Sequence, residues 1–190
     1  MAHNLRPFRN YDEYDVLNVF TYSGVAESPS IVVTKGAFVK VVAPGFQPVA
    51  GNTLGNPIES LGPVGASYNN VVSDRYGAVP KVTLATSGSA VLGMTLLDIR
   101  ELDENGERLG FNPRKVAEMG VVISGQAVPI LTRGTVLYSG VTATAGQVAQ
   151  IAFAGQGELV ASTTLLAGAT KVGTFLGTSV NGIAPLKIEL

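Results

Sequence analysis

The chain has 190 residues, of which 46% are hydrophobic and 14% charged, with a formal net charge of −1 and no cysteine. About 25% of the residues of a typical soluble domain are charged, so this chain carries unusually few charges for its length. The absence of cysteine excludes disulfides, thiolate catalysis and cysteine metal sites, and it fits a protein made in a reducing cytoplasm. The small net charge argues against nucleic acid binding, which needs a basic surface.

The apolar stretches are too short to cross a membrane as helices. A spanning helix needs about 20 apolar residues, and the longest apolar stretches, 121–131 and 90–97, are interrupted by glycine, proline or polar residues. We therefore expect a β protein that hides its extra apolar surface against other chains. The N-terminal sequence lacks the apolar core of a signal peptide, so we do not expect export by that route.

Residues 1–15 form a polar N-terminal arm in which aromatic and arginine side chains alternate with acidic ones. One interpretation is an arm with little structure of its own. The other is an arm that orders on a neighbouring subunit, because aromatic residues and arginine dominate interface energetics. On the second interpretation the partner-binding residues of the arm are Arg6, Phe8, Arg9, Tyr11 and Tyr14.

The remaining residues, 16–190, are predicted to form a single β-rich domain. Residues 16–22 predict a first strand, and 30–43 predict two strands or one bent strand around Gly36. Residues 44–80 are rich in proline, glycine and asparagine and predict a long irregular excursion. Long ordered loops are often functional, so we add its aromatic residues Phe46, Tyr68 and Tyr76 to the partner-binding set.

The middle of the chain predicts strands at 81–86 and 90–102, followed by a hairpin. Asn105 and Gly106 favour a tight turn, from which the hairpin returns through 109–111 and projects as a charged finger. One short helix is predicted at 112–120, because Asn112 can cap it, Pro113 suits its first position and Gly120 can close it. Strand character resumes at 121–123 and 126–132.

The C-terminal stretch, 134–190, predicts a meander of short strands, each rich in β-branched and aromatic residues and ended by glycine. In the last strand the alternation places Leu186, Ile188 and Leu190 on one face, opposite Lys187 and Glu189. We expect Tyr138 to be half-buried and Lys171 to face solvent. The predicted fold is thus mainly β: a small barrel or sandwich of short antiparallel strands with one short helix.

No arrangement of residues predicts an enzyme. The one histidine is His3, and no nucleophile elbow, phosphate-binding loop or dinucleotide motif occurs. A carboxylate-only hydrolase or a calcium loop could draw on the acidic residues of 98–107, but the remaining calcium ligands are missing and a solvated hairpin tip is favoured. Those acidic residues are Asp98, Glu101, Asp103, Glu104 and Glu107. We expect no cofactor and no metal.

The C-terminal half resembles the phage capsid cement, or head decoration, protein family. The resemblance lies in four segments: GTVLYSG at 134–140, GELVAST at 157–163, TKVGTFLGTSVNG at 170–182 and PLKIEL at 185–190. It implies an accessory protein, made in the host cytoplasm, that binds the major capsid protein on the outside of the assembled shell, often as a trimer, and reinforces that shell.

Other classes of function stay open at this point. The chain could be a tail or baseplate component, or another β-rich binding module such as a carbohydrate reader, with 44–80 as its recognition loop. The absence of tryptophan weighs mildly against sugar stacking. An enzyme would require a site built from carboxylates alone, and replacement of Asp98 or Glu101 would test that reading.

Overall fold

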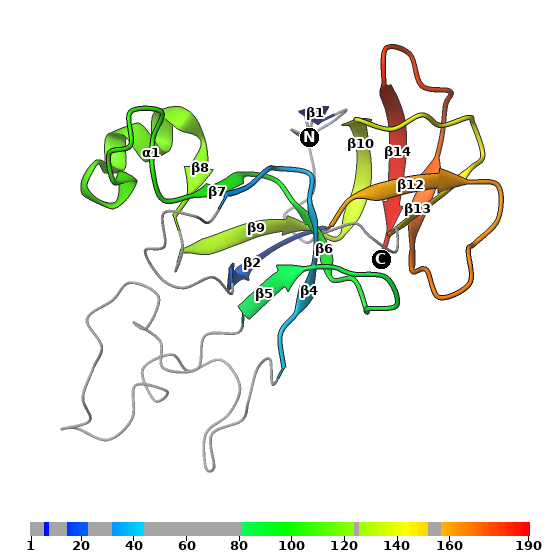
Figure 1. Ribbon diagram of the computed structural model, residues 1–190, viewed down its shortest axis with the longest axis horizontal. Helices are drawn as coiled ribbons and strands as arrows, with labels where there is room; N and C mark the ends of the chain where they lie inside the picture. The colour runs from blue at the N-terminus through cyan, green and yellow to red at the C-terminus, as the bar shows by residue number, and fades with distance from the viewer. Residues whose placement is uncertain (1–5, 8–14, 23–31, 44–80, 124–125, 152–156) are drawn as a thin grey trace.

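The computed structural model describes residues 6–7, 15–22, 32–43, 81–123, 126–151 and 157–190, and these residues are mainly β (Figure 1). They form a closed five-stranded barrel, a six-stranded sheet and a small three-stranded sheet. The predicted β-rich fold is confirmed. The predicted excursion at 44–80 lies outside the described residues.

The barrel has the strand order β2-β5-β4-β6-β9. Its strands are β2 (Val16–Tyr22), β4 (Phe38–Val41), β5 (Lys81–Leu84), β6 (Gly93–Thr95) and β9 (Ala127–Leu131). The prediction of antiparallel pairing is wrong for one pair, because β2 and β5 run parallel, with Thr21 opposite Lys81. In a closed ring of five strands at least one neighbouring pair must run parallel, because strand direction can alternate around a ring only if the number of strands is even.

The three-stranded sheet consists of β3 (Val32–Val33), β7 (Asp98–Arg100) and β8 (Val121–Val122). Here, too, one pair is parallel, β7 with β8. Strands β3 and β4 belong to different sheets and are separated by a turn in which Gly36 has a φ of 93°. Likewise, the single strand expected at 90–102 is divided into β6 in the barrel and β7 in the small sheet.

Residues 101–120, which we call the finger, project from this small sheet. Leu102 bridges to Arg108, and Gly106 has a φ of 82°, so the predicted turn is confirmed. The return segment, however, is a 3-10 helix, η4 (Leu109–Phe111), and not a strand. The predicted helix is present as α1 (Pro113–Met119): the Asn112 side chain accepts a bond from the Lys115 amide at 3.3 Å, and Gly120 closes the helix at φ 61°.

The six-stranded sheet, which we call the sheet lobe together with its loops, has the order β1-β10-β14-β13-β11-β12. Its strands are β1 (Arg6–Pro7), β10 (Arg133–Ser139), β11 (Val148–Ile151), β12 (Leu159–Ser162), β13 (Lys171–Phe175) and β14 (Ile183–Glu189). The five C-terminal strands form where they are predicted. The prediction that they form a meander is wrong, because the last strand, β14, pairs along its whole length with β10 and lies between β10 and β13.

Burial in β14 follows the predicted alternation. Leu186 and Ile188 are fully buried, whereas Lys187 and Glu189 are exposed. Leu190 lies past the end of the strand and is exposed, which corrects its predicted place on the buried face. Tyr138 is buried, at 2% exposure, and not half-buried, because it belongs to the core between the sheet lobe and the barrel, where its ring centroid lies 6.5 Å from that of Phe38. Lys171 faces solvent as expected.

The barrel and the sheet lobe share a hydrophobic core. One cluster of buried residues combines barrel side chains such as Phe38 and Met94 with sheet-lobe side chains such as Tyr138, Phe175 and Leu186. A second cluster fills the barrel and the small sheet. The two parts are therefore packed against each other and do not hang on a flexible linker.

Direct hydrogen bonds also join the barrel to the sheet lobe. Thr132 is the single residue between β9 and β10, and its amide and hydroxyl both donate to the Asp15 carbonyl, at 2.9 and 3.0 Å. The Ser87 hydroxyl donates to the Gly168 carbonyl at 2.8 Å, and the Thr170 hydroxyl donates to the Ser89 carbonyl at 2.9 Å.

Candidate partner-binding surface

The structure describes one of the eight predicted partner-binding residues. Arg6 lies in β1, opposite Leu137 at the edge of the sheet lobe, so at this point the arm follows the chain's own sheet. The others lie outside the described residues: Phe8, Arg9, Tyr11, Tyr14, Phe46, Tyr68 and Tyr76. Their partner-binding role stays a prediction.

Several acidic residues of 98–107 have structural roles. One carboxylate oxygen of Asp98 accepts a bond from the Lys35 amide at 2.6 Å and closes the turn between β3 and β4. Glu101 and Asp103 are 7% exposed each, so the prediction of a solvated hairpin tip is wrong for both. It is confirmed for Glu104 and Glu107, which are exposed.

The Asp103 side chain organises the base of the finger. One carboxylate oxygen accepts bonds from the amides of Asn105 and Glu107, both at 2.8 Å, and the other pairs with the Lys115 ammonium group. The hydrogen bond from Lys115 is the main cause that holds the pKa of Asp103 below its ordinary value, and the amide of Glu107 acts in the same direction. The carboxylate thereby ties the hairpin turn to α1.

The same ion pair compensates an unfavourable feature of α1. Its first turn carries Arg114 and Lys115 and no acidic residue, although the positive end of the helix dipole favours acidic side chains there. The hydrogen bond to Asp103 raises the pKa of Lys115 above its ordinary value. Arg114 pairs with Glu118 one turn later, at 3.0 Å.

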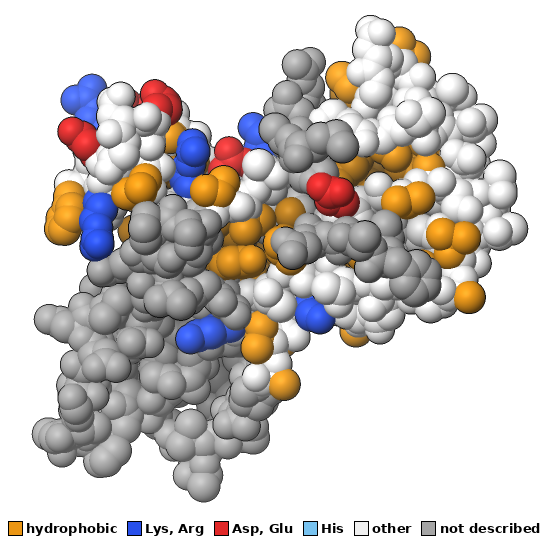
Figure 2. Space-filling model, viewed as in Figure 1, with side chains coloured by type: hydrophobic (Ala, Val, Ile, Leu, Met, Phe, Trp, Pro, Cys, Tyr) orange, Lys and Arg blue, Asp and Glu red, His pale blue; other side chains and the backbone are white. Residues whose placement is uncertain are grey.

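The loops of the sheet lobe expose large apolar side chains. Leu165 and Leu166, in the loop before β13, are 52% and 43% exposed. Leu176 and Val180, in the loop after β13, are 52% and 70% exposed. The two pairs therefore lie at opposite ends of the same strand, and Figure 2 shows hydrophobic side chains dispersed over this part of the surface.

The C-terminal part of the chain, which includes the sheet lobe, carries few charges. The 65 residues of 126–190 include five charged ones: Arg133, Glu158, Lys171, Lys187 and Glu189. Four of them cluster at the end of the sheet where β13 begins, which is also the end that follows the Leu165 and Leu166 loop. There the bond from Lys187 lowers the pKa of Glu189, and the charges of Lys171 and Arg133 add to the effect. Most of the sheet lobe thus presents an uncharged surface to its surroundings.

The exposed apolar residues of the sheet-lobe loops were not among the residues predicted from the sequence to bind a partner. For Leu165 and Leu166 the sequence did contain an indication of exposure. Leu165 and Leu166 are adjacent large apolar residues between Ser, Thr, Ala and Gly, in a segment that lacks alternation. Two consecutive side chains of an extended segment point in opposite directions, so both cannot enter one core. The sequence therefore contained a hint that at least one of them is exposed.

Comparisons of the chain with protein-family models, with curated proteins and with solved structures found no match. Within the described ranges, no helix has the length and apolar character needed to span a membrane. The same residues contain no group of three or more His, Cys, Asp or Glu side chains that could hold a metal ion. Of the ten exposed large apolar side chains among the described residues, four lie in the sheet-lobe loops.

Proposed function

We propose that this chain is a structural virion protein of the capsid cement, or decoration, class. In this role it binds the major capsid protein on the outer surface of a phage head and stabilises the mature shell. The observation that carries the proposal is the sheet lobe, which combines exposed Leu165, Leu166, Leu176 and Val180 with very few charges.

The position of the exposed residues supports contact with more than one neighbour. Apolar loops at both ends of β13 provide two separate contact areas on one rigid body. Burying a half-exposed leucine in an interface contributes about 1 kcal/mol, so neither pair of loop residues would hold a complex alone. A lattice or a trimer, in which each chain makes several such contacts, uses weak areas of this kind together.

The mechanism of stabilisation is mass action and requires no chemistry. A protein that binds the mature shell and not its precursor or its dissociated subunits shifts the equilibrium toward the mature shell. Both contact areas flank β13, which is paired with β11 on one side and with β14 on the other, so their positions relative to each other are fixed and less entropy is lost on binding.

The test is to add the purified chain to undecorated mature heads of the same phage. Stoichiometric binding, with heads that release their DNA at a higher temperature, supports the proposal. Cryo-electron microscopy of the decorated heads would show whether the chain forms trimers on the shell. Failure to bind heads, or detection of the chain only in purified tails or baseplates, would overturn it in favour of the tail component.

A further inference from the structure

Phe111 is the feature of the finger that needs an explanation. It ends η4 and is 85% exposed. It precedes the helix cap Asn112, at the position from which an apolar side chain commonly packs against the fourth helical residue, here Val116. At 85% exposure the phenyl ring does not make that contact to any useful extent, so it is available to a partner.

The backbone under Phe111 is held firmly. Leu109, two residues earlier, is 1% exposed, and its amide donates to the Glu101 carbonyl at 3.0 Å. The Asn112 amide on the other side donates to the Leu109 carbonyl at 2.9 Å. Together with the bonds of Asp103, these contacts hold the backbone and therefore the Cα–Cβ bond of Phe111 in place, so little backbone entropy remains to be lost on binding.

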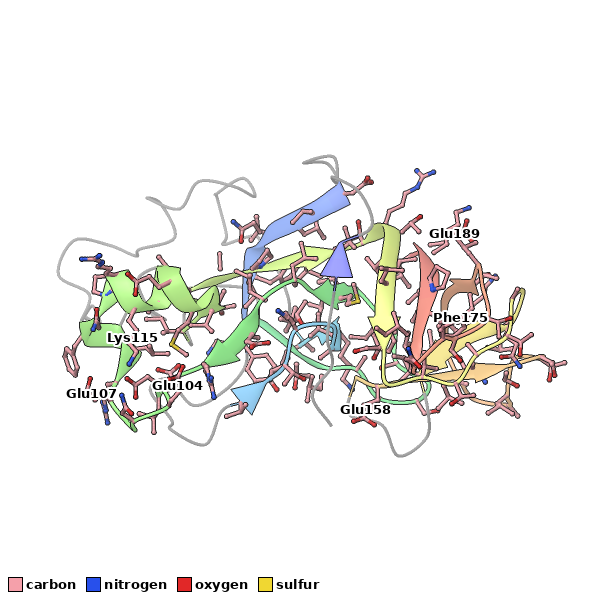
Figure 3. The ribbon with its side chains drawn as sticks, turned by 90° about the horizontal axis from the view of Figure 1, so that it is seen from above. Glu104, Glu107, Lys115, Glu158, Phe175 and Glu189 are labelled. Atoms are coloured by element: carbon pink, nitrogen blue, oxygen red, sulfur yellow. The ribbon has the colours of Figure 1, made fainter. Side chains whose placement is uncertain are left out.

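The charges of the finger indicate what kind of partner fits. The finger has a net charge of −2: Glu101, Asp103, Glu104, Glu107 and Glu118 against Arg108, Arg114 and Lys115. Lys115 and Arg114 are paired with Asp103 and Glu118. Figure 3 shows Glu104 and Glu107 near Lys115 at one end of the molecule, far from Glu158 and Glu189. A partner of opposite charge would bring Lys or Arg, whereas an anionic membrane or a nucleic acid would be repelled.

We propose that Phe111 is an anchor that enters an apolar pocket of the major capsid protein, and that Lys or Arg residues beside this pocket face Glu104 and Glu107. This inference rests on the proposed function and deepens it, since it adds the finger to the contact areas of the sheet lobe. Aromatic side chains that become buried in such pockets commonly carry a large part of the binding energy of an interface.

The test measures the affinity of full-length variants for undecorated heads. Phe111→Ser should bind roughly tenfold to a hundredfold more weakly than the wild-type chain, as expected for an aromatic anchor, while Phe111→Leu should retain part of the affinity. Val19→Ser is the matched control, because Val19 is a 51% exposed apolar residue of the barrel; it should bind like the wild type. All three should keep the wild-type melting temperature, since the replaced side chains are exposed.

The double variant Glu104→Gln/Glu107→Gln tests the charge of the partner. It should bind more weakly than the wild-type chain, and its affinity should vary less between 50 and roughly 500 mM salt, because two screened attractions are lost. Tighter binding of this variant would show that the pocket is flanked by acidic residues and would overturn that part of the inference.

Other outcomes separate this inference from the proposed function. If the wild-type chain binds heads and Phe111→Ser binds equally well, the anchor is refuted and the proposed function stands. If no variant binds heads, both are refuted. If Phe111→Ser abolishes self-association in sedimentation equilibrium or adsorption to phosphatidylglycerol vesicles, and leaves head binding intact, the occupant is a second copy or a lipid surface, and the inference is overturned.

Discussion

The backbone of Gly157 lies directly against the backbone of Phe38. The Phe38 amide donates to the Gly157 carbonyl at 3.0 Å, and the Gly157 amide donates to the Ala85 carbonyl at 2.9 Å. The segment that leads into β12 is thereby inserted beside the neighbouring barrel strands β4 and β5. This contact requires glycine, because a Cβ at position 157 would lie 2.7 Å from the Phe38 carbonyl oxygen, and the residue has a φ of +75°.

Gly157→Ala should therefore destabilise the protein by more than strain of the backbone alone. The left-handed conformation costs an alanine about 1–2 kcal/mol, and relief of the overlap with Phe38 adds about 1–3 kcal/mol. Gly146→Ala is the control, since Gly146 has a φ of +85° and open space around its Cβ position. Urea denaturation followed by circular dichroism measures the stability of both variants. Equal losses of stability in Gly157→Ala and Gly146→Ala would contradict the close contact between Gly157 and Phe38.

Gly173→Ala should also destabilise the protein strongly, for a different reason. Gly173 has no left-handed backbone, but its Cβ would lie 2.0 Å from the Lys187 carbonyl oxygen in the adjacent strand β14. Separating β13 from β14 disturbs the centre of the sheet, so we expect a loss of about 3 kcal/mol or more in the free energy of unfolding. Gly110→Ala, with open space in the finger, should be close to neutral in the same measurement.

The buried Tyr138 should make the protein sensitive to alkali. Burial raises its pKa above the ordinary value, and the bond from the Leu159 amide only partly opposes this. The folded state thus binds a proton that the unfolded chain releases near pH 10, so its contribution to stability is complete below pH 10 and is lost at about 1.4 kcal/mol per pH unit above it.

Denaturation by urea at a series of pH values from about 8 to 12 measures this effect, with tyrosine absorbance reporting ionisation. Tyr138→Phe should lose about 1–2 kcal/mol at neutral pH, because the Leu159 amide is left without its acceptor. The same variant should show a shallower decline above pH 10. An unchanged decline would assign the alkaline effect to another group.

Removal of the Asp103 carboxylate should loosen the finger and leave the rest of the fold intact. Asp103→Ala deprives two amides and Lys115 of their partner, so amide exchange in 104–120 should accelerate while exchange in the sheet lobe stays the same. Asp103→Asn keeps an acceptor for the amides and should have a smaller effect. Uniform acceleration through the whole chain would show that the carboxylate supports the global fold instead.

Acid should act on the same ion pair. The pKa of Asp103 is lowered in the folded state, so its stabilising effect is present above the unfolded value near 4 and is lost as the pH falls through the lower folded value. Amide hydrogen exchange in the finger should therefore be slow at pH 5 relative to the intrinsic exchange rate. At lower pH the amides of the finger should lose this protection. Asp103→Ala should abolish this dependence.

The two apolar loops of the sheet lobe should contribute separately to shell binding. Leu165→Ser/Leu166→Ser and Leu176→Ser/Val180→Ser remove exposed side chains, so we expect little change in the melting temperature of the free protein. Each pair should weaken binding to undecorated heads by roughly tenfold, the value for about 1–2 kcal/mol of lost apolar burial. Wild-type affinity in both double variants would contradict the proposed contact areas.

The candidate site was only partly accessible to sequence reasoning. Aromatic and arginine residues were sensible candidates for an interface, but seven of the eight lie outside the described residues. The exposed Leu165, Leu166, Leu176 and Phe111 were not predicted, because apolar residues are first assigned to a core. Whether a leucine in a loop is covered depends on the neighbouring strands, which a linear pattern does not contain.

What the amino-acid sequence by itself determined is the position of most strands, the faces of β14 and both ends of α1. These features depend on residues a few positions apart: side-chain alternation, a cap three residues from its amide, a glycine that accepts a left-handed turn. The tertiary structure alone decided that β14 pairs with β10, that an odd number of strands closes the barrel with a parallel pair, and that Tyr138 and Asp103 are buried. The physical reason is that each of these depends on packing between segments brought together by the whole fold, where total buried surface and hydrogen bonding outweigh local preference.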